Sequence, residues 1–80
     1  MTSVSLQNAK THLASVLECD PADLTDDDTI ETVEKWDSLN HMRLVLHLED
    51  VIGRQIEPDD TMTLFTVQAI ADFLIKAGAD

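Results

Sequence analysis

The sequence predicts an all-α fold: a small four-helix bundle with three longer helices and one short helix. Apolar residues recur at helical spacing in three separate segments. Residues that commonly begin or end helices flank those segments, and no segment shows the strict alternation of a half-buried strand. A chain of 80 residues with 44% apolar content suits one compact core, so we expect residues 1–80 to form a single domain.

The first helix is expected from about Ser3 to Glu18. Ser3 or Ser5 can cap its start, and Pro21 prevents the helix from continuing. Its buried face consists of apolar residues at helical spacing: Leu6, Ala9, Leu13, Val16 and Leu17. Cys19 follows this face, where a half-buried apolar role is more common than a reactive one, and as the single cysteine it cannot form an internal disulfide.

Residues 20–36 are expected to form a long acidic connection, a feature that is often functional in a compact domain. Leu24, Ile30 and Val33 should hold this connection onto the core. The acidic residues are Asp23, Asp26, Asp27, Asp28, Glu31 and Glu34. The run at 26–28 predicts a solvated acidic patch and at most weak ion binding, because it lacks the glycine and the distal glutamate of a calcium loop. No metal site is therefore predicted.

The second helix is expected from Ser38 to about Ile52. Asp37 or Ser38 is its N-cap, and Gly53 fits the left-handed position after its last turn. At about 100° per residue, one face has core character and is called here the inner stripe: Leu44, Val45, Leu48, Val51 and Ile52. A different face collects a second apolar set, called here the outer stripe: Leu39, Met42 and Leu46.

Two explanations of the outer stripe stay open at the level of sequence. The fold could cover it, for instance with the long connection, or it could be a docking surface for partners. Ser38, at the start of the same helix, also has two possible roles. It could act only as a cap, or its hydroxyl could carry a phosphate close to the free amides and positive dipole end of the helix.

The remaining chain predicts a short helix and a final long one. The short helix covers roughly Asp59 to Leu64, with Pro58 just before it or in its first turn. The final helix runs from about Thr66 to Ala77, and Gly78 ends it. Its inner face consists of Val67, Ile70, Ala71 and Leu74, and Lys76 lies in its last turn.

Composition excludes some classes of partner. The net charge is -11 with only five Lys and Arg residues, which argues against binding to nucleic acid or to an anionic membrane surface. Basic protein surfaces are the expected counterpart. No signal pattern or membrane-spanning apolar run is visible, so we expect a cytoplasmic monomer.

Several stretches together resemble the acyl carrier and peptidyl (aminoacyl) carrier protein family. They are Trp36-Asp37-Ser38-Leu39, the preceding long loop, Leu48-Glu49-Asp50, the segment 56–60 and the segment 66–70. The resemblance covers nearly the whole chain and implies a bundle of acyl-carrier type. It also implies that Ser38 receives 4'-phosphopantetheine from coenzyme A through a phosphopantetheinyl transferase.

The resemblance further implies a free-standing carrier without catalytic residues of its own, not an enzyme. It would hold an acyl or aminoacyl thioester and meet a loading ligase and downstream transferases or synthases. Asp37 would assist the transferase or a metal near the phosphate. The expected partner-binding residues are Trp36, Leu39, Met42, Arg43, Leu46 and Glu49. Trp36 is also a candidate core anchor.

The sequence departs from fatty-acid carriers in two places. Lys35-Trp36 stands where such carriers have small residues, and the helix after Ser38 is interrupted by His41, Arg43 and His47 instead of being strongly acidic. We therefore expect a specialised pathway, such as one making a polyketide, a modified lipid or an activated amino acid.

Three other interpretations were weighed. A cofactor-free acidic helical interaction domain would use the outer stripe and leave Ser38 unmodified. A hydrolase built on Ser38, His41 and Asp37 is disfavoured, because so small a bundle offers no evident cleft and no orienting acid. His12 and His47 look isolated, which predicts surface roles for both.

Overall fold

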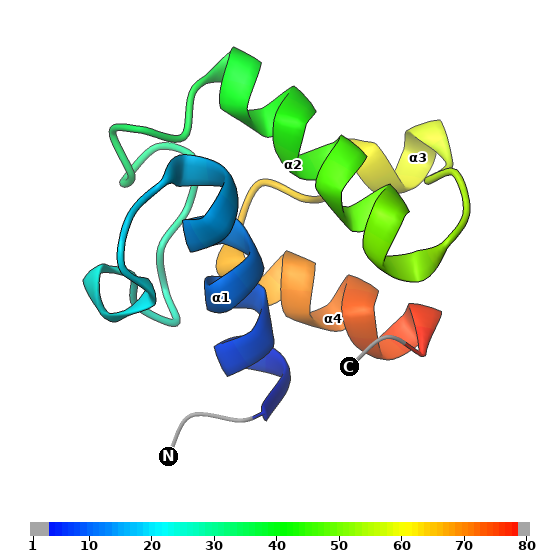
Figure 1. The fold of residues 1–80 in the computed structure, drawn as a ribbon, viewed down its shortest axis with the longest axis horizontal. Helices are drawn as coiled ribbons and strands as arrows, with labels where there is room; N and C mark the ends of the chain where they lie inside the picture. Colours follow the sequence, from blue (N-terminus) through cyan, green and yellow to red (C-terminus); the bar gives the residue numbers. More distant parts are fainter. Residues whose placement is uncertain (1–3, 79–80) are drawn as a thin grey trace.

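The computed structural model describes residues 4–78 and confirms the all-α class. The fold consists of three longer helices and one short helix (Figure 1). The elements are α1 (Val4–Leu17), the 3-10 turn η1 (Pro21–Asp23), α2 (Ser38–Ile52), α3 (Pro58–Thr61) and α4 (Val67–Ala77). Among residues 4–78 no strand forms, and the only bridge is an isolated one between Thr29 and Thr66. Within the same residues, no helix combines the length and apolar character needed to cross a membrane.

The structure excludes one of the two residues that were predicted to cap the start of α1. Ser5 is the second residue of the helix and is buried, so the interpretation of Ser5 as a cap is wrong. A residue inside the helix already has helical backbone angles, whereas a cap has non-helical ones. The alternative cap, Ser3, lies outside the described residues.

The end of α1 is set by backbone geometry before the proline is reached. Glu18 has a φ of 57°, in the left-handed region that a non-glycine residue adopts at a cost of about 1–2 kcal/mol. The amide of Cys19 then donates to the carbonyl of Ala14 at 3.0 Å, which closes the last turn. The helix therefore ends ahead of Pro21, which begins the unpredicted turn η1 with Asp20 as its N-cap.

The core lies between α1, α2 and α4, and α1 packs against both other helices. Its largest fully buried side chains come from all three helices and from the connections between them: Leu13, Trp36, Leu44, Leu48, Leu64, Val67, Ile70 and Leu74. Phe73 is also buried although it was not predicted on the inner face of α4. The predicted contacts of the long connection are confirmed, with Leu24 buried and Ile30 and Val33 packed against the core.

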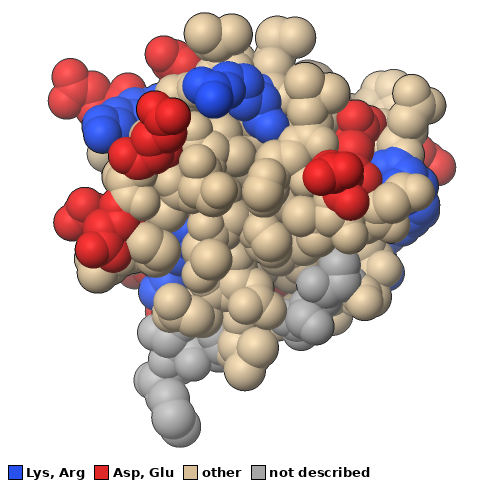
Figure 2. Space-filling model, viewed as in Figure 1, with Lys and Arg blue, Asp and Glu red and all other residues tan. Residues whose placement is uncertain are grey.

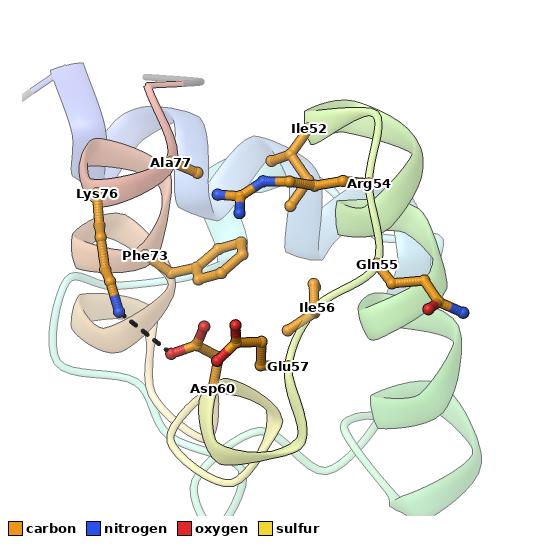
Figure 3. Close-up of a pocket in the computed structure, with 9 residues that line it drawn as sticks. All are labelled: Ile52, Arg54, Gln55, Ile56, Glu57, Asp60, Phe73, Lys76 and Ala77. Carbon is orange, nitrogen blue, oxygen red and sulfur yellow. Dashed lines mark ion pairs between the residues drawn. The ribbon is translucent and has the colours of Figure 1, made fainter.

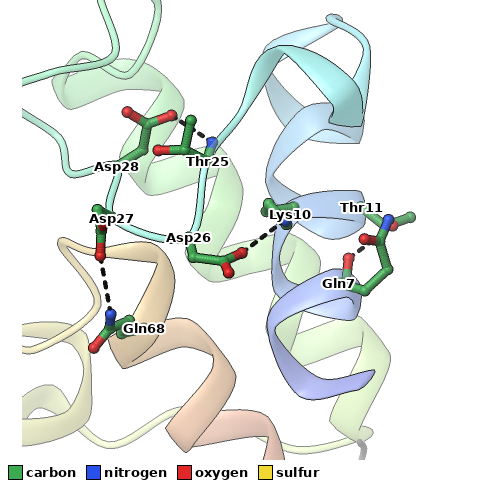
Figure 4. Close-up of polar contacts among 8 residues, drawn as sticks. All are labelled: Gln7, Lys10, Thr11, Thr25, Asp26, Asp27, Asp28 and Gln68. Carbon is green, nitrogen blue, oxygen red and sulfur yellow. Dashed lines mark hydrogen bonds and ion pairs between the residues drawn. The ribbon is translucent and has the colours of Figure 1, made fainter. Parts of the chain in front are cut away.

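The acidic run at 26–28 was predicted to be a solvated patch; Asp27 is exposed and Asp26 and Asp28 are partly exposed, but all three carboxylates also form specific bonds. Lys10 Nζ lies 2.7 Å from Asp26 Oδ1, and this lysine side chain is almost entirely buried. Asp28 accepts from the Thr25 amide at 2.8 Å, and Gln68 Nε2 donates to Asp27 at 3.3 Å. Figure 4 shows the three carboxylates turned to three different partners. They hold the connection to α1 and α4.

Backbone hydrogen bonds also join the long connection to the start of α4. The Ile30 amide donates to the Phe65 carbonyl at 2.8 Å, and the Val67 amide donates to the Asp28 carbonyl at 3.0 Å. The Thr66 hydroxyl caps α4 by accepting from the Ala69 amide at 2.9 Å. The middle of the connection, residues 28–30, is therefore held in place by residues more than thirty positions away.

The short helix α3 begins one residue earlier than predicted, at Pro58, and ends three residues earlier. The Thr63 hydroxyl donates to the Asp60 carbonyl at 2.8 Å, a local bond that competes with continuation of the helix. Lys76 Nζ lies 3.5 Å from Asp60 Oδ1 and links α3 to the last turn of α4 (Figure 3).

Candidate functional site

Ser38 is the first residue of α2 and is exposed. The sequence offered both Asp37 and Ser38 as the N-cap of α2. In the structure Asp37 is the N-cap, because its Oδ1 accepts a hydrogen bond from the Asn40 amide at 2.9 Å. Its carbonyl accepts from the His41 amide at 2.8 Å. The Ser38 hydroxyl takes part in none of the hydrogen bonds found within residues 4–78. It is therefore available for chemistry at the surface.

The start of α2 suits an attached phosphate. The first amides of a helix have no partner inside the helix. Here Asp37 accepts hydrogen bonds from two of them, the Asn40 amide through its side chain and the His41 amide through its carbonyl. The amides of Ser38 and Leu39 come before the first intrahelical bond and lie at the positive end of the helix dipole. A phosphodiester on the Ser38 hydroxyl would lie beside both.

Trp36 anchors the chain just before this site. Its side chain is 1% exposed, and its Nε1 donates to His41 Nδ1 at 3.1 Å. Asn40 Nδ2 donates to the Lys35 carbonyl at 2.7 Å, which ties the same segment to the first turn of α2. The prediction of Trp36 as a partner-binding residue is therefore wrong, because the indole is enclosed by the core. Trp36 anchors the segment that precedes Ser38 to the core.

His41 is turned into the fold and not towards Ser38. Its ring stacks on Phe65 with centroids 4.6 Å apart, and its Nδ1 accepts from Trp36, so the proton sits on Nε2. Nε2 is buried without a hydrogen bond of good geometry among the described residues. Burial lowers the pKa of His41, and the nearby Thr61 backbone partly opposes this. Because Nδ1 bonds Trp36 and Nε2 is buried, neither ring nitrogen acts as a base for Ser38, which argues against a hydrolase.

The outer stripe is exposed, so the explanation that the fold covers it is wrong. The exposed fractions are 68% for Leu39, 66% for Met42 and 64% for Leu46, and Met62 at the end of α3 reaches 70%. In the inner stripe, Val51 was expected in the core but is 37% exposed. Three residues correspond to about 300° of helix, so Val51 lies some 60° from Leu48, at the edge of the covered face.

A groove of about 350 Å³ lies between α2 and α3, next to the outer stripe. Its lining is almost entirely apolar and consists of His41, Met42, Val45, Leu46, Thr61, Met62 and Phe65. Phe65 and Met62 were missed by sequence reasoning, because they come from the segment around α3 that has no periodic pattern. The groove extends the apolar surface from α2 onto α3.

Glu49 has a structural contact that the sequence did not indicate. Its Oε2 accepts from the amide of Ile56 at 2.9 Å, and Ile56 is itself buried. The carboxylate therefore fixes the connection between α2 and α3. A role of Glu49 in partner binding remains a prediction.

His12 and His47 were interpreted as isolated surface residues, and this is wrong. His12 Nδ1 lies 3.0 Å from His47 Nε2, with ring centroids 5.1 Å apart, so one imidazole donates a hydrogen bond to the other across α1 and α2. Burial, and secondly the proximity of His47, lower the pKa of His12. The pair was not visible in the sequence because 35 positions separate its members. Within residues 4–78, no group of three or more His, Cys, Asp or Glu side chains could hold a metal ion.

A protein-family model described as "Phosphopantetheine attachment site" matches residues 9–74. The chain therefore belongs to this family of carrier domains, which bear a 4'-phosphopantetheine prosthetic group and work with synthetases and transferases. A search of curated proteins finds no match. Family membership confirms the resemblance seen in the sequence and the cofactor it implies.

Proposed function

We propose that Ser38 is the attachment residue and that this carrier holds an acyl or aminoacyl group for a specialised biosynthetic pathway. The observation that carries the proposal is the exposed Ser38 hydroxyl, left unbonded in the first turn of α2 because Asp37 takes the capping role. When bound, 4'-phosphopantetheine would supply a terminal thiol that carries the cargo as a thioester. The long arm raises the effective concentration of the cargo at each partner enzyme.

Two neighbouring residues would prepare Ser38 for modification. Asp37 ends the extended segment and starts the helix, so the backbone that carries the Ser38 hydroxyl is fixed. We propose that the Asp37 carboxylate also assists the transferase or a metal near the phosphate. Trp36 holds the preceding segment against the core. Together they would leave Ser38 exposed on a rigid base, so that the enzyme does not have to order the chain before reaction.

The outer stripe and Arg43 support a role in partner docking. An enzyme that acts on Ser38 must approach the start of α2, where Leu39, Met42 and Arg43 are exposed. Exposed methionine adapts to differently shaped partners. The lack of acidic residues in this part of α2 supports a dedicated pathway in place of central fatty-acid synthesis.

The test is intact-protein mass spectrometry after incubation with coenzyme A and a broad-specificity phosphopantetheinyl transferase. We expect the wild-type chain to gain one phosphopantetheinyl group and Ser38→Ala to gain none. Ser15→Ala is the matched control, since Ser15 is an exposed serine within α1, and it should be modified like the wild type. Modification that persists in Ser38→Ala would show that another residue is the attachment site.

Family membership argues against the cofactor-free interaction domain that the sequence left open. Such a domain predicts no gain of mass in any variant, even though circular dichroism shows each to be folded. The two functions are therefore separated by the same experiment.

A further inference from the structure

The ten residues that follow Ser38 differ in charge from the protein as a whole. The net charge is -11, which by itself favours basic partners. Between Ser38 and Leu48, however, the only Lys, Arg, Asp or Glu residue is Arg43. Figure 2, viewed onto α1 and α2, shows a broad area without charge in the middle of the face and charged side chains mainly towards its margins.

Arg43 lies at one edge of the outer stripe, and it forms no ion pair within residues 4–78. At about 100° per residue, it is some 40° from Leu39 and 60° from Leu46 around the helix axis. Its side chain is exposed, and its one hydrogen bond is a long one of 3.4 Å to Asn40 Oδ1. The salt bridges found within residues 4–78 are Lys10–Asp26 and Lys76–Asp60, so Arg43 forms none of them.

The acidic residues at the two ends of α2 do not cancel this charge. The Asp37 carboxylate caps the helix, and the Glu49 carboxylate holds the Ile56 amide. Asp50 is exposed on the same side of α2 and lines a shallow surface cavity together with Arg43. The two side chains form no ion pair among those found within residues 4–78, so Arg43 is left open to a partner.

We propose that the enzymes acting at Ser38 dock on the outer stripe with an apolar surface that carries a carboxylate opposite Arg43. This rests on the proposed function and names the chemistry of its partners. An apolar surface fits because Leu39, Met42 and Leu46 are exposed by more than half. A carboxylate fits because a guanidinium at the edge of an apolar contact forms a short, two-point hydrogen bond with it, whereas a lysine or arginine there is repelled.

Two synthetic helical peptides of about 18 residues, long enough to form a helix, provide the probe. Both have the same leucine stripe, flanked by glutamates in one peptide and by lysines in the other. Binding to the 15N-labelled unmodified protein is followed by amide shifts at physiological ionic strength. The variants are Arg43→Glu and, as control with the same change in charge, Arg54→Glu. Arg54 follows α2 and lines a cavity with Phe73 and Lys76, away from the outer stripe (Figure 3).

We expect the glutamate peptide to shift the amides of residues 39–46 and to bind more tightly than the lysine peptide at that surface. Arg43→Glu should weaken binding of the glutamate peptide at least about threefold, and Arg54→Glu should leave it unchanged. The proposal is overturned if the lysine peptide binds these residues equally well or better, if neither peptide does, or if both variants weaken binding alike. Because the protein is unmodified, this result is independent of whether Ser38 accepts the arm.

Discussion

The two sides of α2 carry the same kind of residue in opposite environments. Leu44 and Leu48 are fully buried, whereas Leu39 and Leu46, on the same helix, remain largely exposed. The inner leucines belong to one core cluster with residues of α1 and α4, whereas the outer leucines face solvent on the side of α2 that Arg43 borders. The comparison shows that apolar character alone does not distinguish a residue that stabilises the fold from one that binds a partner.

The largest expected effect contrasts a leucine from each side. Leu48→Ala should lower the free energy of unfolding by about 2–5 kcal/mol, because it leaves a cavity in the core. Leu46→Ala should change it by less than about 0.5 kcal/mol, because the side chain is already in water. Urea denaturation of both variants provides the measurement. Equal losses for both would show that the outer stripe is part of the folded core.

A second variant tests the N-cap of α2, the helix that carries both apolar sides. Asp37→Ala removes the cap of the Asn40 amide and should cost about 1 kcal/mol of stability. Asp72→Ala, an exposed residue within α4, is the control and should be near neutral. Thermal unfolding measures both. The cap interpretation would be wrong if Asp37→Ala melted at the temperature of the wild type.

Acid should lower the stability of the fold through the partly buried histidines His12 and His41. Burial holds the pKa of His12 and of His41 below 6.5 in the folded protein. The unfolded chain therefore binds more protons, so the stability contributed by the neutral rings is complete above about pH 6.5 and is lost as the pH falls below it. We expect the melting temperature to decrease from pH 7.5 to 5.5.

The variant His12→Gln separates this effect from general titration, since it removes one of the two groups with a lowered pKa. Its melting temperature should decrease less over the same pH range. An identical decrease in the variant and the wild type would contradict a role for His12.

The smallest expected effect concerns the exposed acidic surface. Excess negative charge destabilises the compact state by repulsion, and salt screens it. Added NaCl should raise the melting temperature by a few degrees, corresponding to less than about 1 kcal/mol. MgCl2 at equal ionic strength should have the same effect, because no three-ligand metal cluster exists within residues 4–78. A flat or falling trend would show that charge repulsion does not limit stability.

Sequence reasoning succeeded where the determining contacts are local. The bounds of α2, the αL conformation of Gly53 and the last turn of α4 were all predicted, since periodicity and capping involve residues within a few positions. It failed for the histidine pair and for the carboxylates of Asp26 and Asp27, because each of these bonds a partner that no local pattern connects with it.

The order of residues alone was sufficient to indicate the carrier family, the cofactor, and Ser38 as the attachment candidate at a helix start. These depend on a short motif and on local helix signals. The tertiary structure decided which apolar side of α2 is covered, that Trp36 is an anchor enclosed by the core, and that Arg43 is the unpaired charge beside Leu39. Such outcomes depend on which distant segments pack against a residue, and burial is a property of that packing and not of the residue itself.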